Sequence, residues 1–333
     1  MATDTTMARP SRDLWERLLS NQAFWVTIAV IVIPVAMTLV EPSFSEAFWK
    51  EGNFFNITRN FAFIAIMALG QVAVIITGGI DLSVGSVLAV CGIVLGVLME
   101  NYDMPFWVGA LGAILTGVIC GAINGYFISY LRLSAFVVTL GMMSIGRSLA
   151  LVISDNKFFS KFGHDKDLLI AIGGGKSFGI ANPVIILLAL TILTGFVLRY
   201  TGWGRHLYAI GGNENAARLT GVPVDRMKFS VYVISGVMTA ISAILTVGWL
   251  GSVTNGLGVG YELRVIASTV IGGANLLGGE GGAYSAVIGA ALLEVIRNSL
   301  LLAGVNPYWQ NTFVGIFLIL AVLLERIRGR KVN

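Results

Sequence analysis

The chain has 333 residues, of which 56% are hydrophobic and only 12% are charged, and its mean hydropathy is +0.82. Soluble domains carry about 25% charged residues, so this composition excludes an ordinary soluble protein and indicates a membrane protein. Apolar residues run continuously rather than alternating, which excludes a transmembrane β-barrel. The net charge of +4 reflects membrane topology, as its distribution shows below, rather than nucleic-acid binding.

Ten apolar stretches fill most of the chain, each long enough, or nearly long enough, to cross about 30 Å of hydrocarbon. The fold class is therefore all-α, a polytopic membrane protein with about ten transmembrane helices. The third and eighth stretches are short, so we expect half-membrane or broken helices there, buried in protein or facing water. The predicted spans are residues 22–40, 57–77, 84–99, 106–128, 134–153, 182–199, 229–250, 263–278, 282–303 and 308–325.

Positive charge is distributed unevenly over the connections between spans. With the N-terminus inside, thirteen of the 22 Lys and Arg residues lie in inner segments and seven in outer ones, which matches the cytoplasmic preference of these residues. We therefore expect a cytoplasmic N-terminal segment (1–21), one transmembrane domain (22–325) and a cytoplasmic basic tail (326–333). Connection 201–228 is predicted to be cytoplasmic and connection 154–181 to lie outside. The first span has no small-residue cleavage site after it, so we interpret it as retained.

The cytoplasmic connection 201–228 contains a short helix with clear start and stop signals. Asn213 is a suitable N-cap, Glu214 suits the positive end of a helix, and Gly221 can close it in a left-handed conformation. Two turns of helix are not stable alone, so either a partner protein or the chain's own membrane domain must pack against it. The residues expected at a partner contact are Arg205, Asn213, Glu214, Ala216, Ala217, Arg218 and Gly221, with the small alanines permitting close approach.

The segment Gly78–Ser86 joins the second span to the third. Asp81 or Ser83 can cap the helix that follows, and the same groups could line a polar path for a solute. Both interpretations stay open, because a broken helix in a transporter is often broken at the pathway. The polar groups at helix breaks or within spans that we expect near a solute are Asp81, Ser83, Asn124, Thr139, Arg147 and Asn298.

Charged residues within spans need partners, because an unpaired charge near the bilayer centre costs about 2.5–3.5 kcal/mol. Glu294 and Arg297 are three residues apart on one helix face and can pair with each other or contact solute. Arg147 has no carboxylate one turn away, so it requires a partner from another span or a polar cavity. On the fourth span, Gly117, Gly121 and Gly125 repeat every four residues and indicate close helix packing.

Catalytic chemistry finds little support in the sequence. His164 and His206 lie in connections on opposite sides of the membrane, and Cys91 and Cys120 lie within spans as buried hydrophobic residues. The run 173–177 resembles a phosphate-binding loop, but position 170 is Ile where that motif requires Gly. We therefore predict no enzyme activity, no metal site and no cofactor.

Several motifs in order resemble one family. Gly78–Ser86 resembles the signature of the ribose-type sugar permeases of bacterial ATP-binding cassette importers, and the resemblance covers the chain after residue 50. The other matching segments are Asn124–Gly125, Thr139–Arg147, Gly211–Val222, Gly260–Gly273, Gly278–Gly281 and Asn298. The chain departs from the family pattern at Ser134, Glu294, Arg297 and Ser299, which stand where the family often has proline, glycine, asparagine and glycine.

The resemblance implies a fold shared with sugar and cobalamin importers and a place in the bacterial inner membrane. It implies uptake of a monosaccharide or related polyol delivered by a periplasmic sugar-binding protein. ATP would be bound by a separate cytoplasmic ATPase that contacts connection 201–228, and a second permease subunit, expected to be an identical copy, would complete the pathway. The surrounding lipid is the remaining partner.

Three alternatives remain at this stage. The same architecture could carry nucleosides, branched-chain amino acids or a signalling sugar. An ion-coupled secondary transporter would need a carboxylate relay within the membrane, and the spans offer only Asp81, at a helix break, and Glu294, next to an arginine. A membrane enzyme would need the catalytic cluster that the sequence lacks.

Overall fold

The computed structural model describes residues 21–40, 42–309, 312–316, 319 and 323. The predicted tenth span, 308–325, and the two predicted terminal segments fall largely outside these residues. In the described part, eight helices are long and apolar enough to cross a membrane. They are α2 (Gln22–Val40), α4 (Glu51–Ile76), α5 (Val84–Gly96) continued by a π-helical turn η1 (Val97–Asn101), α6 (Phe106–Ser129), α7 (Ala135–Ser154), α9 (Asn182–Tyr200), α12 (Val224–Leu250) and α14 (Ala283–Leu302).

Shorter elements connect these long helices. A two-stranded antiparallel sheet precedes α9, and two short helices fill the connection between α9 and α12. The short elements are α3 (Pro42–Phe48), η2 (Gly163–Asp165), α8 (Lys166–Gly174), β1 (Lys176–Ser177), β2 (Ile180–Ala181), α10 (Gly202–Gly212), α11 (Glu214–Leu219), α13 (Tyr261–Gly272) and η3 (Pro307–Trp309).

The two short predicted spans have different outcomes. The third is a full-length helix, because η1 extends α5 to Asn101 and gives an 18-residue segment. The eighth is short as expected, since α13 has 12 residues and so covers about 18 Å, well under the hydrocarbon thickness. Glycines with positive φ, Gly260 (78°) and Gly273 (115°), bound α13 on both sides, and other residue types would be strained there.

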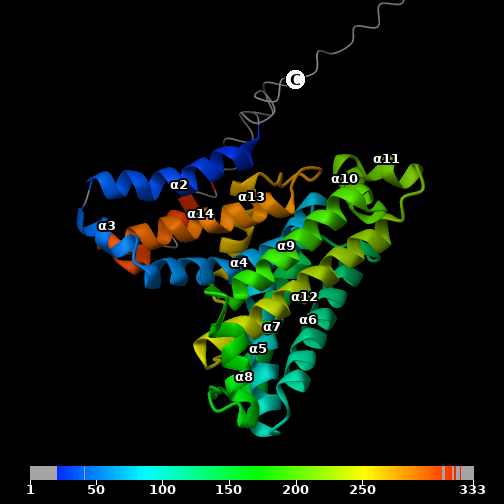
Figure 1. Ribbon diagram of the computed structural model, residues 1–333. Helices are drawn as coiled ribbons and strands as arrows, with labels where there is room; N and C mark the ends of the chain where they lie inside the picture. Colours follow the sequence, from blue (N-terminus) through cyan, green and yellow to red (C-terminus); the bar gives the residue numbers. More distant parts are fainter. Residues whose placement is uncertain (1–20, 41, 310–311, 317–318, 320–322, 324–333) are drawn as a thin grey trace, which may run out of the picture.

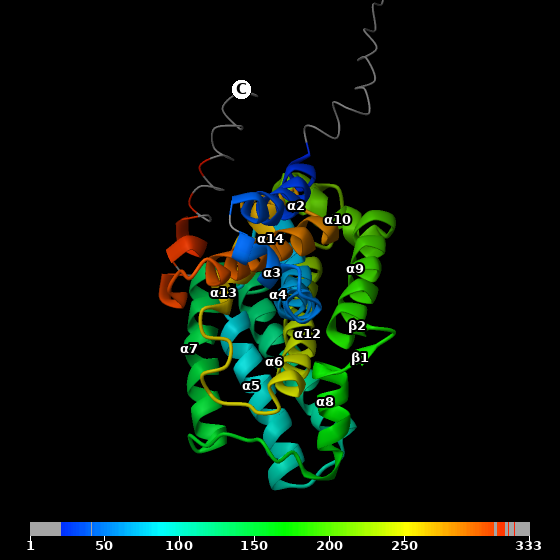
Figure 2. The same ribbon diagram turned by 60° about the vertical axis from the view of Figure 1, so that its left-hand side comes forward.

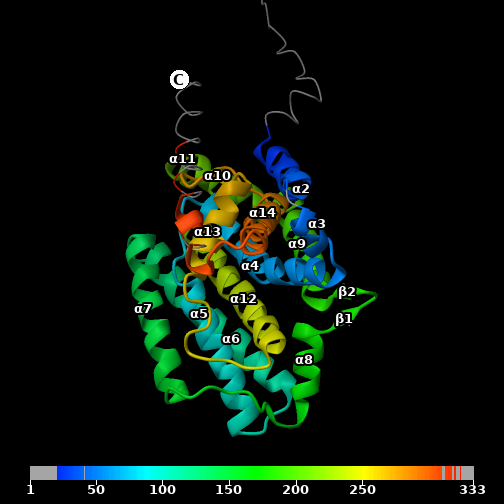
Figure 3. The ribbon, with the colours of Figure 1, turned by 90° about the vertical axis from the view of Figure 1, so that its left-hand side faces the viewer.

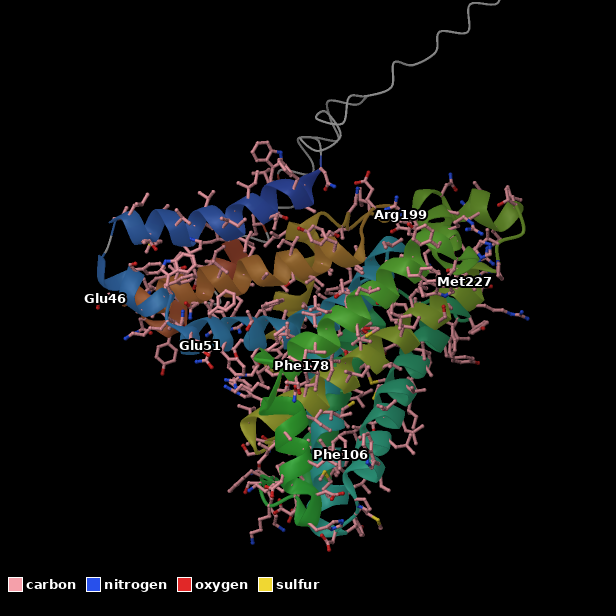
Figure 4. All side chains as sticks on the ribbon, in the orientation of Figure 1. Glu46, Glu51, Phe106, Phe178, Arg199 and Met227 are labelled. Carbon is pink, nitrogen blue, oxygen red and sulfur yellow. The ribbon has the colours of Figure 1, made fainter. Side chains whose placement is uncertain are left out.

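The long helices converge toward α10 and α11 and diverge away from them (Figure 1). One arm holds α2, α3, α14 and the start of α4, and the other holds α5, α6, α7 and α8. Figures 2 and 3 place α7 on one side of the second arm and α9 on the other, with α5, α6 and α12 between them. Arg199 and Met227 mark the convergent end in Figure 4, whereas Glu51 and Phe106 lie toward the ends of the two arms. We call the convergent end the α10–α11 end.

The core is built on α4 and α12. In the most apolar 18-residue stretch of each of these helices 78% of the residues are buried, against 17% in α2 and α9. The glycine repeat of α6 packs on α12 within the same chain, because a Cβ atom at Gly117 or Gly121 would overlap the carbonyl oxygen of Gly236 or Tyr232. This contact confirms that the repeat permits close approach of helix backbones.

Two glycine-containing turns meet at the α10–α11 end. The turn after α4 contains Gly78, and the turn between α13 and α14 contains Leu277 and Gly279. The N–H of Gly279 donates to the carbonyl oxygen of Ile76 (2.9 Å), which closes one turn on the other. Both turns therefore lie at the same end of the molecule.

Candidate functional site

The segment between α4 and α5 carries a buried carboxylate. Asp81 is only 3% exposed, and its Oδ1 accepts from the N–H (2.9 Å) and the hydroxyl (2.6 Å) of Ser83. Its Oδ2 accepts from the hydroxyl of Ser235 on α12 (2.8 Å). Burial raises the pKa of the Asp81 carboxyl, whereas the hydrogen bonds from Ser83 and Ser235 act in the opposite direction. Asp81 thus joins the helix break to α12.

Three further polar side chains complete this cluster. The amide of Asn124 on α6 donates to the Ser83 hydroxyl (3.0 Å), and the hydroxyl of Thr139 on α7 lies 3.3 Å from the carbonyl oxygen of Ile80. The amide of Gln71 pairs with the backbone of Asp81, accepting from its N–H (3.1 Å) and donating to its carbonyl (3.2 Å). Five helices, α4, α5, α6, α7 and α12, therefore meet at one polar point. Ser83 is N-terminal to α5 but makes no side-chain cap to it.

The predicted pathway residue Arg147 lies elsewhere. Its Nη1 donates to the backbone carbonyl oxygens of Asn255 (2.7 Å) and Leu257 (2.9 Å), in the connection between α12 and α13. The partner that the sequence requires is thus a pair of carbonyl groups from a distant connection. Arg147 fixes that connection against α7.

The last predicted pathway residue, Asn298, lies in the other arm. Its amide exchanges two hydrogen bonds with that of Asn53 near the start of α4 (2.9 and 3.1 Å). Directly before Asn298 on α14, Arg297 forms an ion pair with Glu294, in which Arg297 Nε donates to Glu294 Oε2 (2.7 Å). The structure thus brings Asp81, Ser83 and Asn124 together with Thr139 beside them, and separates Arg147 and Asn298 from them.

The connection 201–228 forms two helices rather than one. Thr201 caps α10 by accepting from the N–H of Gly204 (3.3 Å), and Asn213 caps α11 by accepting from the N–H of Ala216 (3.0 Å). Gly221, after α11, has φ of 86°. The predicted N-cap and the left-handed glycine are therefore confirmed, whereas α10 was missed.

The orientation of α11 corrects one expectation. Ala217 is only 4% exposed, because it packs on Ile210 of α10 and Val224 of α12 within this chain. Ala217 therefore cannot present its side chain to a partner. It is buried because a two-turn helix is stable only when one of its faces packs against other elements. Ala216 is exposed on α11, and Leu219 is 89% exposed. The free apolar surface of α11 is thus centred on Leu219.

Charged side chains hold α11 to the start of α12. Arg218 donates to both carboxylate oxygens of Asp225 (2.7 and 3.1 Å), and Glu214 accepts from Lys228 (2.9 Å). These pairs are part-exposed and individually weak, but together they fix the helix on the membrane domain. Arg205 on α10 is exposed and donates to the carbonyl oxygen of Tyr200 (3.4 Å).

Helix α10 is fastened directly to the two glycine turns. A Cβ atom at Gly211 would overlap the carbonyl oxygen of Ile76 and the backbone nitrogen of Gly279. The hydroxyl of Tyr208 donates to the carbonyl oxygen of Gly281 (2.8 Å). Motion of α10 would therefore be transmitted to the end of α4 and to the start of α14.

A cavity of about 350 Å³ lies between α11 and the turn after α4. Its walls include Gly79, Tyr232, Ser129 and the ion-paired Glu214 and Lys228. The hydroxyls of Tyr232 and Ser129 are buried without a hydrogen-bond partner. Tyr232 lies close to Gly79, so this cavity adjoins the segment that carries Asp81. Among the residues that the structure describes, no group of three or more His, Cys, Asp or Glu side chains is placed to hold a metal ion.

The geometry is that of a membrane domain with a capped, partly exposed helix, α11, at one end, and the comparisons give its family. The model of the family described as "Branched-chain amino acid transport system / permease component" matches residues 53–322. The chain belongs to this family. It is a multi-pass membrane permease of the ATP-binding cassette class.

Curated relatives of the permease cover nearly its whole length. The ribose import permease protein RbsC of Haemophilus influenzae is 33% identical over 94% of this chain and 95% of its own. RbsC of Escherichia coli is 35% identical over 90% and 92% of the two chains. The L-arabinose transport system permease protein AraH of Escherichia coli is 34% identical over 99% and 98%.

Sequence reasoning missed two members of the Asp81 cluster. Gln71 and Ser235 are fully buried within the long apolar helices α4 and α12. A single polar residue inside a span is the available signal, since a polar group in hydrocarbon needs a partner. Many serines and threonines of the permease give the same signal while bonding only their own helix backbone, as Thr116 does. The signal therefore could not single out these two residues.

Proposed function

We propose that this permease is the membrane-spanning subunit of an ATP-driven importer of a monosaccharide or related polyol in the bacterial inner membrane. The supporting observation is its similarity over 90% or more of its length to permeases named for ribose and L-arabinose. A permease named for D-allose is also 33% identical over 91% of this chain. The shared chemistry of these three solutes is a small neutral polyhydroxylated ring.

In this proposal the α10–α11 end faces the cytoplasm, and both termini do as well. The charge distribution of the sequence supports this orientation. A separate ATPase docks on α11, where Leu219 is 89% exposed while the opposite face of the helix is held by Ala217 and the ion pairs. An exposed leucine on a helix whose opposite face is fixed can bury its apolar area in a pocket on a partner.

Solute release is assigned to the region between the Asp81 cluster and α11. The cluster presents hydroxyl, amide and carboxylate groups, which can exchange hydrogen bonds with sugar hydroxyls. The cavity of about 350 Å³ next to it reaches α11. Docked α10 contacts the same turn through Gly211, so the ATPase can open or close this exit. A periplasmic sugar-binding protein delivers the solute, and a second copy of the permease completes the path.

The function is tested by uptake into proteoliposomes that contain the permease, its ATPase and its solute-binding protein. We expect ATP-dependent uptake of one of D-ribose, L-arabinose or D-allose, and no uptake of leucine or adenosine. Preferential uptake of leucine or adenosine would show that the solute class is wrong. Uptake that is driven by a proton or sodium gradient without the ATPase would show that the energy source is wrong.

The docking surface is tested by Leu219→Asp, with Asn215→Asp as a control that adds the same charge to an exposed residue of α11. Burial of a leucine side chain is worth about 2 kcal/mol, so its replacement should weaken ATPase binding roughly 30-fold. Binding is measured by co-purification and by light-scattering titration. Equal binding by the two variants would show that the ATPase docks elsewhere.

A further inference from the structure

A second and larger hollow lies at the α10–α11 end, apart from the Asp81 cluster. It is a groove of about 790 Å³ between the start of α2, the end of α9, α10 and the turn that leads into α14. It shares no lining residue with the cavity beneath α11. Its volume falls within the range of about 300–1,000 Å³ that is usual for small-molecule sites.

One end of the groove is basic. Arg199 comes from the last turn of α9 and Arg205 from the first turn of α10, and both are exposed. Figure 4 shows Arg199 where α9 meets α10. Glu280 is the acidic side chain among the lining residues, so the arginines leave an excess of positive charge. Gly282, the N-cap of α14, offers no side-chain cap, and Gly282 and the first residues of α14 line the groove, so the positive end of this helix lies next to it.

One wall of the groove is apolar and follows a membrane-spanning helix, while polar residues such as Gln22 and Thr191 lie beside it. Ile192, Gly195 and Leu198 of α9 form this wall, together with Ala23 of α2. Arg199 is seven residues beyond Ile192, so the groove extends about 10 Å along α9 from its basic end. The neighbouring face of α9 is apolar and exposed, as Phe196 (57%) shows. The groove therefore suits a ligand with an anionic head and an apolar tail.

We propose that this groove binds an anionic phospholipid, with its phosphate between Arg199 and Arg205 and an acyl chain along α9. Anionic lipids are attracted to Lys and Arg at the membrane surface. A basic pocket between transmembrane helices can also enclose the lipid headgroup. The lipid would come from the cytoplasmic leaflet, and this choice of leaflet alone rests on the orientation given under the proposed function. Binding of the lipid does not depend on which solute the permease carries.

The lipid would act on helix α10. Two of the groove walls are α10 and the turn before α14, which the hydrogen bond from Tyr208 to Gly281 already joins. A phosphate that bridges Arg199 on α9 and Arg205 on α10 adds a further connection between these elements. The bound lipid thus stabilises α10 in the position seen here, against Ile76 and Gly279.

The test is native mass spectrometry of the full-length permease with dioleoyl-phosphatidylglycerol or dioleoyl-phosphatidylcholine added at equal concentrations. We expect phosphatidylglycerol to be retained preferentially. Each arginine near an anionic headgroup contributes about fivefold in affinity, so Arg199→Gln should weaken retention about fivefold and the double variant with Arg205→Gln about 25-fold. Phosphatidylcholine retention should not change in these variants.

Two further variants separate the groove from general surface charge. Arg132→Gln removes an exposed arginine that is not part of the groove and should leave phosphatidylglycerol retention unchanged. Gly195→Phe fills the apolar wall, where a Cβ atom meets only Ala283 at 3.8 Å, and should reduce retention of both lipids. Melting curves of all variants identify any that fail to fold. If Arg199→Gln fails to fold, Arg199→Lys, which keeps the positive charge, takes its place and should retain the lipid.

Five results would overturn the proposal. Three are equal retention of the two lipids by the wild type, an equal loss in Arg132→Gln, and full retention by Gly195→Phe. The fourth is displacement of phosphatidylglycerol by an equal concentration of inorganic phosphate or glycerol 3-phosphate, which would assign the groove to a soluble anion. The fifth is a dimer that dissociates in Arg199→Gln without any change in lipid retention, which would assign the groove to a second copy of the chain.

Discussion

Replacement of Gly211 by alanine should displace helix α10 from its position on the membrane domain. The added Cβ atom would lie 2.9 Å from the Cα atom of Gly279, whereas ordinary contact begins at 3.4 Å, and it would overlap the carbonyl oxygen of Ile76 still more. Backbone atoms surround the site, so α10 must move by at least 0.5 Å, the difference between these two distances. Overpacking of this kind costs about 1–3 kcal/mol.

A displaced α10 also weakens the hydrogen bond from Tyr208 to Gly281 (2.8 Å), which is worth about 0.5–1.5 kcal/mol. The total cost is then about 1.5–4.5 kcal/mol. Gly212→Ala is the matched control, because no atom lies within 4 Å of its added Cβ atom.

The assay is thermal unfolding followed with a thiol-reactive dye. Cys91 and Cys120, the two cysteines of the chain, are both buried and become reactive on unfolding. We expect Gly211→Ala to melt well below the wild type and to lose coupling of ATP hydrolysis to transport, while Gly212→Ala behaves as the wild type. If the two variants melt together and transport equally, then the contact of α10 with the glycine turns carries neither stability nor coupling.

Three further predictions concern other parts of the permease. A cysteine at position 177 should react with an impermeant thiol reagent added outside intact cells, and a cysteine at position 215 should not. Both Ser177 and Asn215 are exposed, so the reverse pattern would invert the proposed topology. Asp81→Asn should lower the free energy of unfolding by about 1–3 kcal/mol in the thiol assay. The reason is that the new amide group places a donor where the hydroxyls of Ser83 and Ser235 and the N–H of Ser83 already donate. An unchanged melting temperature would contradict this. Glu294→Gln should lower the free energy of unfolding by about 1–3 kcal/mol because it leaves Arg297 without its carboxylate. The double variant with Arg297→Gln should recover part of that loss. A double variant whose loss equals the sum of the losses of the two single variants would show that the pair is not coupled.

Local signals in the sequence determined the membrane class, the positions of the long helices and the ends of α11. Continuous apolar runs predict spans because each stretch must cross the hydrocarbon by itself. Asn213 and Gly221 were identified correctly because a cap or a left-handed closing residue acts within a few residues along the chain. The short α13 was also expected from its length alone.

The tertiary structure alone decided which polar groups meet. Asp81 bonds to Ser235, 154 residues away, and Arg147 bonds to carbonyl groups more than 100 residues away, and no local pattern encodes such pairings. The same reason separates Asn298 from the Asp81 cluster, since the two lie on helices that diverge in space.

The face that a short helix buries was likewise decided by packing. The sequence shows small and apolar residues in α11, but only the docked position of α10 and α12 turns Ala217 inward and leaves Leu219 exposed. A two-turn helix has too little hydrophobic periodicity to fix its own orientation, so its neighbours fix it. Composition and local caps thus specify the elements of this permease, whereas contacts between distant helices specify its polar cluster, its coupling contact and its groove.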